Sequence, residues 1–376
     1  MVGLVIYGIL YSIFANFTIN SNNSYDPKLS LYGFEDVDQW WLYAAVIKNA
    51  YLNNPAGYNS FIVTYWHAFV PLYPASVAIV DFIFNNFVIS TIVLNSILSI
   101  GTLFNLKKII TELCDFQEKD AKLILVLYQS NFVVSIDMIM LNLSMPWITF
   151  SLTLAFYANI KFLDHVDLKT GTMVFLTNTL VLMCREIIWP FVLLCPALLL
   201  VKSVQKKKNG EHLGFSMFMK TELKVSYFTT LLPAIFYLSF LFLMNNYQTV
   251  FIAFELLKEW PPLRTVPGSL LFAFFAFSFM PFFIFFDAKN IYHKKENLPL
   301  IVWIVIFVII RFVMPGPFWA AYWEPIIFCV CILGFQWLKN GRFKTKANLI
   351  LIILILTNLV FSLYLYLIRF ILPFND

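Results

Sequence analysis

The chain has 376 residues, 60% of them hydrophobic and only 12% charged, and its formal net charge is +5. Its mean hydropathy of +0.78 excludes a soluble globular domain, in which about a quarter of the residues are charged. The basic residues occur in short runs, the densest being the three lysines at 206–208, and no basic folded region is present to bind a nucleic acid. The composition therefore predicts a membrane protein with no nucleic-acid partner.

Apolar runs long enough to cross a bilayer recur along the whole sequence. We expect a single integral-membrane domain over 1–376, an all-α polytopic bundle with about eleven transmembrane helices. The predicted spans, in chain order, are 2–19, 75–104, 123–140, 145–162, 172–184, 187–201, 227–244, 268–286, 298–313, 324–338 and 348–368. The second span is longer than a bilayer requires, which predicts a tilt or an end outside the membrane.

Most of the 26 basic residues fall in alternate loops, beginning with the loop that follows the second span. Lysine and arginine are retained on the cytoplasmic side of a membrane. We therefore expect a cytoplasmic amino terminus and two large loops, at about 20–74 and 245–267, on the outer (extracellular or lumenal) face. Helical spacing of apolar residues within the first loop predicts short helices that lie along the membrane surface.

The first outer loop carries the sequence Gly-Phe-Glu-Asp-Val-Asp-Gln-Trp-Trp at 33–41. Glu35, Asp36 and Asp38 stand beside Trp40 and Trp41, and carboxylates near a bilayer are rarely retained without a function. One carboxylate can act as the general base that takes the proton of an attacking hydroxyl, and tryptophan faces stack on sugar rings. The alternative is structural, because Asp38 also suits the N-cap of the surface helix.

Arg185 and Arg264 are the candidates for contact with a phosphate group, because arginine binds phosphate oxygens through two parallel hydrogen bonds. Arg185 precedes Glu186 between two short spans, so the two could instead form a structural ion pair. His67, the only histidine of the outer loops, is either part of a sugar pocket or a solvated side chain. One histidine among scattered acids gives no metal-ligand pattern, and no nucleotide or cofactor motif is present. We expect no metal and no cofactor.

Four charged residues near the ends of predicted spans are weaker candidates for the functional site. Asp137 and Arg311, near the outer ends of the third and ninth spans, are lesser candidates for the site, whereas Asp81 and Glu324 are interpreted as interfacial. The cysteines show no disulfide or metal-ligand spacing, so we expect small buried apolar residues. They are Cys114, Cys184, Cys195, Cys329 and Cys331.

Several segments together resemble a known family, the GPI mannosyltransferase II family with its prokaryotic relatives. The first loop supplies Asp-Gln-Trp-Trp-Leu-Tyr at 38–43, Val-Ile-Lys-Asn-Ala-Tyr at 46–51 and the most specific stretch, Phe-Val-Pro-Leu-Tyr-Pro at 69–74. Three further landmarks are similar in order and spacing: Leu-Ser-Met-Pro-Trp at 143–147, Cys-Arg at 184–185 and Tyr-Trp-Glu-Pro at 322–325. The family's aspartate aligns with Gln39, so Asp38 matches with a shift of one residue, and Ala50 replaces a family glycine.

The resemblance implies a GT-C fold, in which outer loops hold the site of a membrane glycosyltransferase. It implies transfer of a sugar, mannose above all, from a polyprenyl phosphate to a lipid- or protein-linked glycan with inversion. The first outer loop would carry the base, either Asp38 or Asp36, with Arg185 and Arg264 facing the phosphate. The expected partners are the polyprenyl-phosphate sugar, a glycan or glycolipid acceptor and the bilayer. The same loop supplies the residues expected to shape the sugar pocket: Glu35, Trp40, Trp41 and His67.

Two other functions remain open. A polytopic transporter or lipid-linked sugar flippase would have charges and broken helices near the bilayer midplane, whereas most carboxylates here fall in the outer loops. If the chain is a non-catalytic subunit of a glycosyltransferase complex, the complex should stay active when the acids of the first loop are neutralised.

Overall fold

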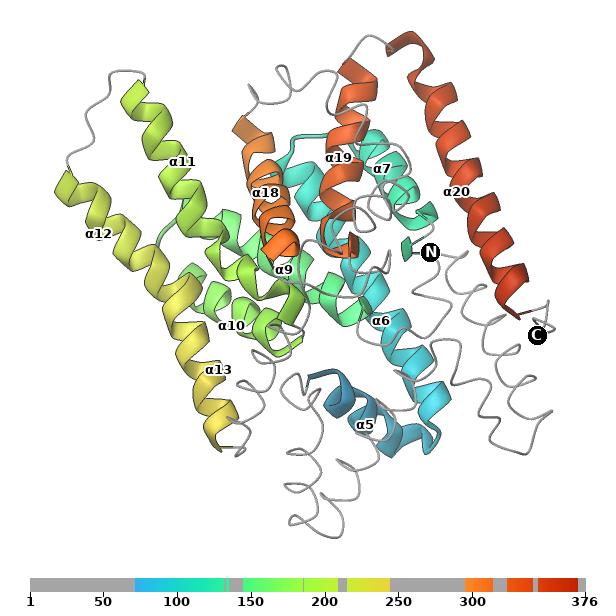
Figure 1. Cartoon of the computed structure of the whole chain (residues 1–376), viewed down its shortest axis with the longest axis horizontal. Coiled ribbons are helices and arrows are strands. Elements are labelled where there is room, and N and C mark those ends of the chain that lie inside the picture. Colours follow the sequence, from blue (N-terminus) through green and yellow to red (C-terminus); the bar gives the residue numbers. More distant parts are fainter. Residues whose placement is uncertain are drawn as a thin grey trace.

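The computed structural model of the chain describes residues 72–131, 133–134, 145–184, 186–208, 215–243, 295–313, 323–340 and 344–370. Within these ranges all regular elements are helices, arranged as a bundle (Figure 1). The α-helices are α5 (Leu72–Phe84), α6 (Phe87–Lys108), α7 (Glu118–Ser130), α9 (Met145–Asp164), α10 (Leu168–Cys184), α11 (Leu194–Lys208), α12 (Phe215–Ser226), α13 (Leu232–Leu243), α18 (Leu298–Val313), α19 (Glu324–Asn340) and α20 (Ala347–Phe370).

Shorter helical segments extend several of these helices. Three are 3₁₀ helices and two are π-helical turns. The 3₁₀ helices are η4 (Glu186–Leu193), η6 (Lys295–Asn297) and η8 (Lys344–Lys346), and the π turns are η3 (Ile109–Leu113) and η5 (Tyr227–Leu231). The predicted spans 2–19 and 268–286 and the predicted surface helices lie outside the described residues, so the number of eleven spans stays a prediction.

Prolines in the first turn mark where several helices begin. Pro74, Pro146, Pro299 and Pro325 are each the second or third residue of α5, α9, α18 and α19. A proline there loses no hydrogen bond, because the first backbone N–H groups of a helix have no partner within the helix, and its fixed φ suits the first turn. The sequence therefore sets these starts locally.

Among the described residues, three helical stretches are long and apolar enough to cross a membrane: Ile89–Leu113, Ile188–Gln205 and Lys220–Phe240. The shorter apolar stretches are Ala75–Phe84, Leu168–Cys184, Leu298–Ile310 and Ala347–Val360. Many large apolar side chains are also exposed, for example Ile352, Leu356 and Val360 on α20. A soluble monomer rarely exposes so much contiguous apolar surface. The described helices therefore fit an all-α membrane protein.

The prediction of one long span over 75–104 is wrong, because the chain breaks into α5 and α6. Asn85 has a φ of 47°, a left-handed conformation that asparagine adopts more readily than most residues. The side-chain oxygen of Asn86 then accepts a hydrogen bond of 3.2 Å from the backbone N–H of Ile89, which caps the start of α6. Apolar residues flank both asparagines, so the hydropathy of the sequence conceals the break.

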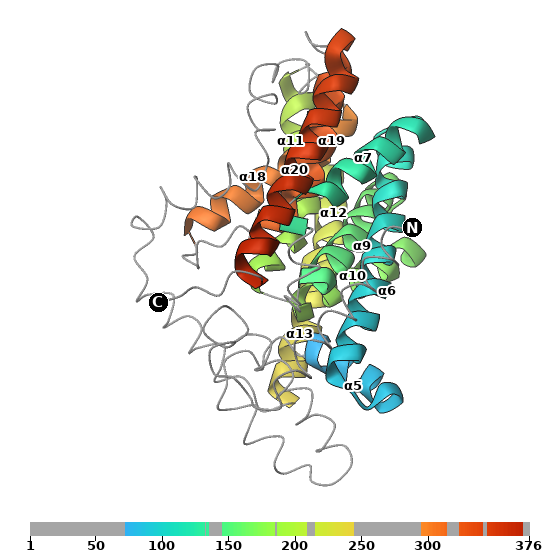
Figure 2. The ribbon, with the colours of Figure 1, turned by 90° about the vertical axis from the view of Figure 1, so that its right-hand side faces the viewer.

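Helix α19 lies at the centre of the bundle, between α18 and α7 (Figures 1 and 2). Its residues are buried all round from Glu324 to Leu338, as expected for a helix enclosed on every side. Phe328 of α19 contacts Phe156 of α9 with ring centroids 5.5 Å apart. Phe191 of η4 lies 5.0 Å from Trp303 of α18 in the same edge-to-face manner. This aromatic core fixes α19 against α9 and α18.

The five cysteines are free and buried, as predicted. Cys329 and Cys331 belong to the interior of α19, and Cys195 of α11 lies against Asn159 of α9. Burial in apolar surroundings keeps such thiols as inert packing groups.

Lysines of the described helices gather at one end of the bundle, here called the lysine-rich end. Lys339 at the end of α19 bonds Asp120 of α7 at 3.0 Å, and Lys107 of α6 bonds Glu118 of α7 at the same distance. Lys224 of α12 donates to the carbonyl of Val166, between α9 and α10. Exposed pairs of this kind add little stability, but they show that these helix ends meet. The end of α19 and the start of α20 lie toward the top of Figure 1, whereas α5 lies at the bottom.

Candidate functional site

The residues proposed from the sequence as the catalytic and substrate-binding set lie outside the described residues. The set comprises Glu35, Asp36, Asp38, Trp40, Trp41, His67, Arg185 and Arg264. Asp137 lies outside as well. Their roles, and the choice between Asp36 and Asp38 as the base, stay predictions.

The structure does bring several of the landmark segments to the half of the bundle that lies away from the lysine-rich end. Tyr73 opens α5, Pro146 opens α9, Cys184 ends α10 and Glu324 opens α19. The thiol of Cys184 lies 3.2 Å from the hydroxyl oxygen of Ser151 on α9. The end of α10 is therefore packed directly on the first turns of α9.

Glu324, which the sequence analysis interprets as interfacial, is buried inside the bundle, with 4% of its surface exposed. The indole N–H of Trp303 donates a 3.0 Å hydrogen bond to the carbonyl of Pro325, which fixes the start of α19. A carboxylate at a helix start is favoured by the helix dipole, and this offsets part of the cost of burial. The sequence could not reveal the burial, because it depends on the helices that surround α19.

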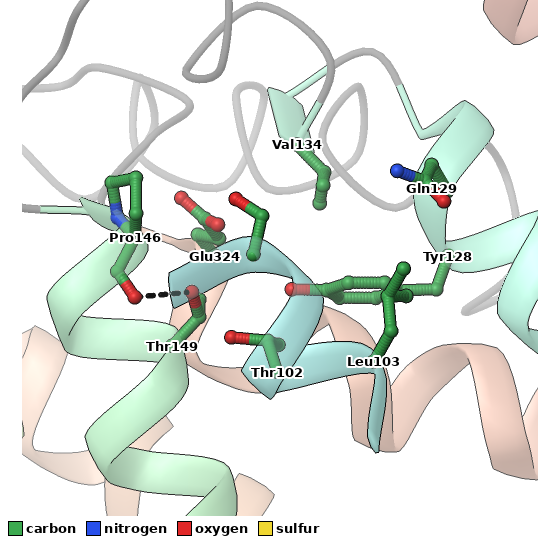
Figure 3. Close-up of a pocket in the computed structure, with 9 residues that line it drawn as sticks. Thr102, Leu103, Tyr128, Gln129, Val134, Pro146, Thr149 and Glu324 are labelled. Carbon is green, nitrogen blue, oxygen red and sulfur yellow. Dashed lines mark hydrogen bonds between the residues drawn. The ribbon is translucent and has the colours of Figure 1, made fainter. Parts of the chain in front are cut away.

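A cavity lies beside Glu324, between α6, α7, α9 and α19 (Figure 3). Its volume is about 20 Å³, which is enough for about one water molecule and too little for a sugar ring. The polar lining consists of Ser99, Thr102, Tyr128, Gln129, Thr149 and Glu324. The rest of the described lining is apolar, and none of the described lining residues is basic.

The hydroxyl groups of the lining have defined roles. Thr102 donates to the carbonyl of Leu98 at 2.9 Å, and Thr149 donates to the carbonyl of Met145 at 3.0 Å. Because each hydroxyl oxygen also has two acceptor lone pairs, both oxygens can still accept a hydrogen bond. Figure 3 shows the Tyr128 hydroxyl directed toward the side of the cavity that holds Thr102, Thr149 and Glu324. The cavity therefore places a few hydroxyl groups and the Glu324 carboxyl group in an otherwise largely apolar lining.

Polar residues at helical spacing on α6 are the signal that sequence reasoning missed. Thr91, Asn95, Ser99 and Thr102 recur every three or four residues in an otherwise apolar helix, so they share one face. In the structure this face meets Tyr73 of α5 at one end and the cavity further along. The stripe therefore identifies the buried polar side of α6.

Asp81 is also buried inside the bundle, with 1% of its surface exposed. Its carboxylate accepts a 3.1 Å hydrogen bond from the hydroxyl of Ser90 on α6. This bond ties α5 to α6 across the Asn85–Asn86 break, so the geometry gives Asp81 a structural role.

Within the described helices, no three histidine, cysteine, aspartate or glutamate side chains come together in a group that could hold a metal ion. No protein-family model matches the chain, and neither a curated protein nor a solved structure matches it. The resemblance to the mannosyltransferase family therefore rests on the motifs quoted above, and the positions of four of them around one half of the bundle are the structural observation to be explained.

Proposed function

We propose that the chain is a GT-C-type membrane glycosyltransferase that transfers a sugar, most simply mannose, from a polyprenyl phosphate to a glycan acceptor. The supporting observation is that Tyr73, Pro146, Cys184 and Glu324, each from a different family landmark, lie in the half of the bundle opposite the lysine-rich end. Lysines mark the cytoplasmic side. The proposal therefore puts the site on the outer face, where a lipid-linked sugar donor is presented.

In the proposed reaction, Asp38 or Asp36 takes the proton of the acceptor hydroxyl as its oxygen attacks the anomeric carbon. The bond from that carbon to the phosphate oxygen breaks, and the configuration inverts. Arg185 and Arg264 compensate the negative charge of the departing polyprenyl phosphate. Glu35, Trp40, Trp41 and His67 shape the sugar pocket. The reaction needs no metal or cofactor for these steps.

The experiment is sugar transfer in membranes that contain the chain, supplied with labelled polyprenyl-phosphate mannose and native lipid acceptors. Arg264→Gln is expected to lower kcat at least tenfold at equal abundance, because one charge-assisted contact to the leaving group is lost. Arg369→Gln, at the far end of α20, is the matched control. Equal loss in both variants would contradict a specific role for Arg264.

The orientation of the chain in the membrane can be tested separately. Single cysteines placed in a cysteine-free chain at Lys207 and at Ser144 would be labelled with an impermeant maleimide in sealed cells. The proposal expects labelling from outside at 144 and not at 207. The reverse pattern would put the landmark half of the bundle in the cytoplasm and would exclude an externally presented donor.

A transporter or flippase is the second candidate, because two helical stretches depart from the α-helical pattern inside the bundle. Pro190 lies within η4 before α11, and the π turn η5 separates α12 from α13. Broken helices often line substrate paths in transporters. The discriminating result is movement of a labelled lipid-linked sugar across a reconstituted bilayer without transfer to an acceptor.

A non-catalytic subunit is the third candidate. It predicts that transfer by the native complex survives when Asp36 and Asp38 are both changed to asparagine, provided that the complex still assembles.

A further inference from the structure

Helices α6 and α9 lie side by side, and both end at the lysine-rich end (Figure 2). Each helix carries a row of residues spaced three or four apart, and such residues share one face of a helix. The row on α6 is Ile97, Gly101, Phe104 and Lys108, and the row on α9 is Phe150, Leu154, Tyr157 and Lys161. Each row therefore leads along apolar or aromatic positions to one lysine.

The two rows meet at both ends. A Cβ atom built on Gly101 would lie 2.5 Å from Cε2 of Phe150, so the helices approach closely where α6 has no side chain. Toward the lysine-rich end, the ammonium groups of Lys108 and Lys161 each lie 5.6 Å from the centroid of the Tyr157 ring, which is within the range of a cation–π contact. The rows therefore form one continuous surface, here called the α6–α9 strip.

The α6 side of the strip faces outward. Ile97 is 59% exposed and Phe104 is 57% exposed, and Lys108 is exposed as well. Ile97 and Lys108 are eleven residues apart, which is about 16 Å along a helix and close to half of a hydrocarbon core of about 30 Å. The strip therefore has the length of one lipid leaflet, with apolar side chains at the level of the tails and ammonium groups at the level of the headgroups.

Glu112 on the π turn η3 compensates only one of the two lysines. Its carboxylate accepts a 2.6 Å hydrogen bond from the Tyr157 hydroxyl and pairs with Lys161 at 3.4 Å. Among the described residues, no carboxylate forms an ion pair with Lys108. The two lysines and Glu112 together carry one net positive charge, so an anion with a single negative charge would neutralise the cluster.

We propose that the α6–α9 strip binds one anionic phospholipid, with its phosphate at Lys108 and Lys161 and an acyl chain along Ile97 and Phe104. Charge-assisted contacts to the two ammonium groups hold the phosphate, and basic positions between transmembrane helices bind anionic headgroups in this way. A zwitterionic lipid brings its own cation toward the two lysines, so it binds more weakly. A free phosphate lacks the acyl chain and gains nothing from the apolar rows.

The test uses the purified full chain in a mild detergent, with dioleoyl phosphatidylglycerol as the probe and bound lipids counted by native mass spectrometry. Wild type should bind this lipid more tightly than dioleoyl phosphatidylcholine. Lys108→Gln should weaken phosphatidylglycerol binding roughly tenfold, because one charge-assisted contact is lost. Lys169→Gln, at an exposed lysine in the first turn of α10, removes the same charge at the same end of the bundle and should bind like wild type.

Phe104→Ser provides a second variant that leaves the charge of the strip unchanged. Because Phe104 is exposed, the fold should be kept, and the loss of apolar contact should weaken phosphatidylglycerol binding. Equal affinity of wild type and Lys108→Gln, equal affinity for the two lipids, or an equal loss in Lys169→Gln would overturn the proposal. So would displacement of phosphatidylglycerol by a similar concentration of inorganic phosphate, since this would assign the lysines to a free anion.

The outcome does not depend on the proposed function, because no residue of the strip belongs to the proposed catalytic or sugar-binding set. Sugar transfer with no lipid preference would reject the strip alone, and a lipid preference without transfer would reject the transferase alone.

Discussion

The side-chain amide of Asn178 on α10 donates a 2.7 Å hydrogen bond to the backbone carbonyl of Thr229, the middle residue of the π turn between α12 and α13. Pro233 stands four residues after Thr229 and has no N–H to donate, so an α-helix would leave this carbonyl without its usual partner. Asn178 supplies the missing donor. Asn159 of α9 in turn donates to the Asn178 side-chain oxygen at 2.7 Å.

The first prediction concerns this bond. Asn178→Leu is expected to destabilise the protein by about 1–3 kcal/mol, because the buried Thr229 carbonyl loses its donor. Pro233→Ala restores an N–H at position 233, so the double variant should lose less stability than the sum of the two single variants. Thermal unfolding in detergent provides the measurement, with Thr172→Ala on the exposed face of α10 as the control. Simple additivity would show that the two sites are independent.

Close packing between α6 and α9 gives the second prediction. A Cβ atom built on Gly101 would lie 2.5 Å from Cε2 of Phe150, so the helices approach at a glycine as they often do in membranes. Gly101→Val is expected to cost about 1–3 kcal/mol through overpacking. Phe150→Leu should partly restore the stability of the Gly101→Val variant. If Gly101→Val melts like wild type, α6 and α9 are not in contact at this position.

The third prediction concerns the hydrogen bond that fixes the start of α19. Trp303→Phe keeps an aromatic ring against Phe191 but loses the bond to the Pro325 carbonyl. Trp189→Phe loses an equivalent bond, of 2.8 Å to the Leu182 carbonyl, elsewhere in the bundle. Both should lower stability by about 1 kcal/mol. Thermal unfolding in detergent provides the measurement, and a Trp303→Phe variant that melts like wild type would show that the bond to the Pro325 carbonyl does not stabilise the start of α19.

The fourth prediction is a pH dependence at the turn between α9 and α10. The carboxylate of Asp167 accepts a 2.8 Å hydrogen bond from the backbone N–H of Thr170, and this bond, with that from the Thr170 hydroxyl, lowers the pKa of Asp167. A lowered pKa means stabilisation that is present above the pKa of the unfolded chain, near 4, and is lost as the pH falls through the folded pKa.

Asp167→Ala removes this cap and should lower the melting temperature by roughly 2–4 °C at neutral pH. The melting temperatures of wild type and variant should converge as the pH falls below about 4. Asp164→Ala, an exposed change at the end of α9, serves as the control. A difference that persists unchanged into acid would mean that the charge of Asp167 is not what stabilises α10.

Local sequence signals predicted much of the helical framework. The predicted spans 298–313 and 324–338 correspond to α18 and α19, because an apolar run preceded by a proline in the first turn defines a helix start without help from neighbours. The break at Asn85 was not predicted, since apolar residues continue on both sides of it.

Features that depend on contacts between helices could not be predicted from local sequence signals. The burial of Glu324 results from α19 being enclosed on all sides, and the cavity combines residues from four helices that are far apart in the sequence. The π turn at Tyr227–Leu231 depends on a donor from α10. The hydropathy pattern holds no information on which helices contact one another. The sequence analysis therefore interprets Glu324 as a residue at the membrane interface.

The most direct measurement of the central claim is transfer of labelled mannose from its polyprenyl phosphate to native lipid acceptors by purified chain in nanodiscs. Wild type is compared with Asp38→Asn, Asp36→Asn and the control Glu118→Gln at equal protein concentration. The account predicts transfer by wild type and the control, and a loss of at least about a hundredfold in one aspartate variant, as expected for removal of a general base. Undiminished transfer by both aspartate variants, or none by wild type with any polyprenyl-phosphate sugar, would contradict it.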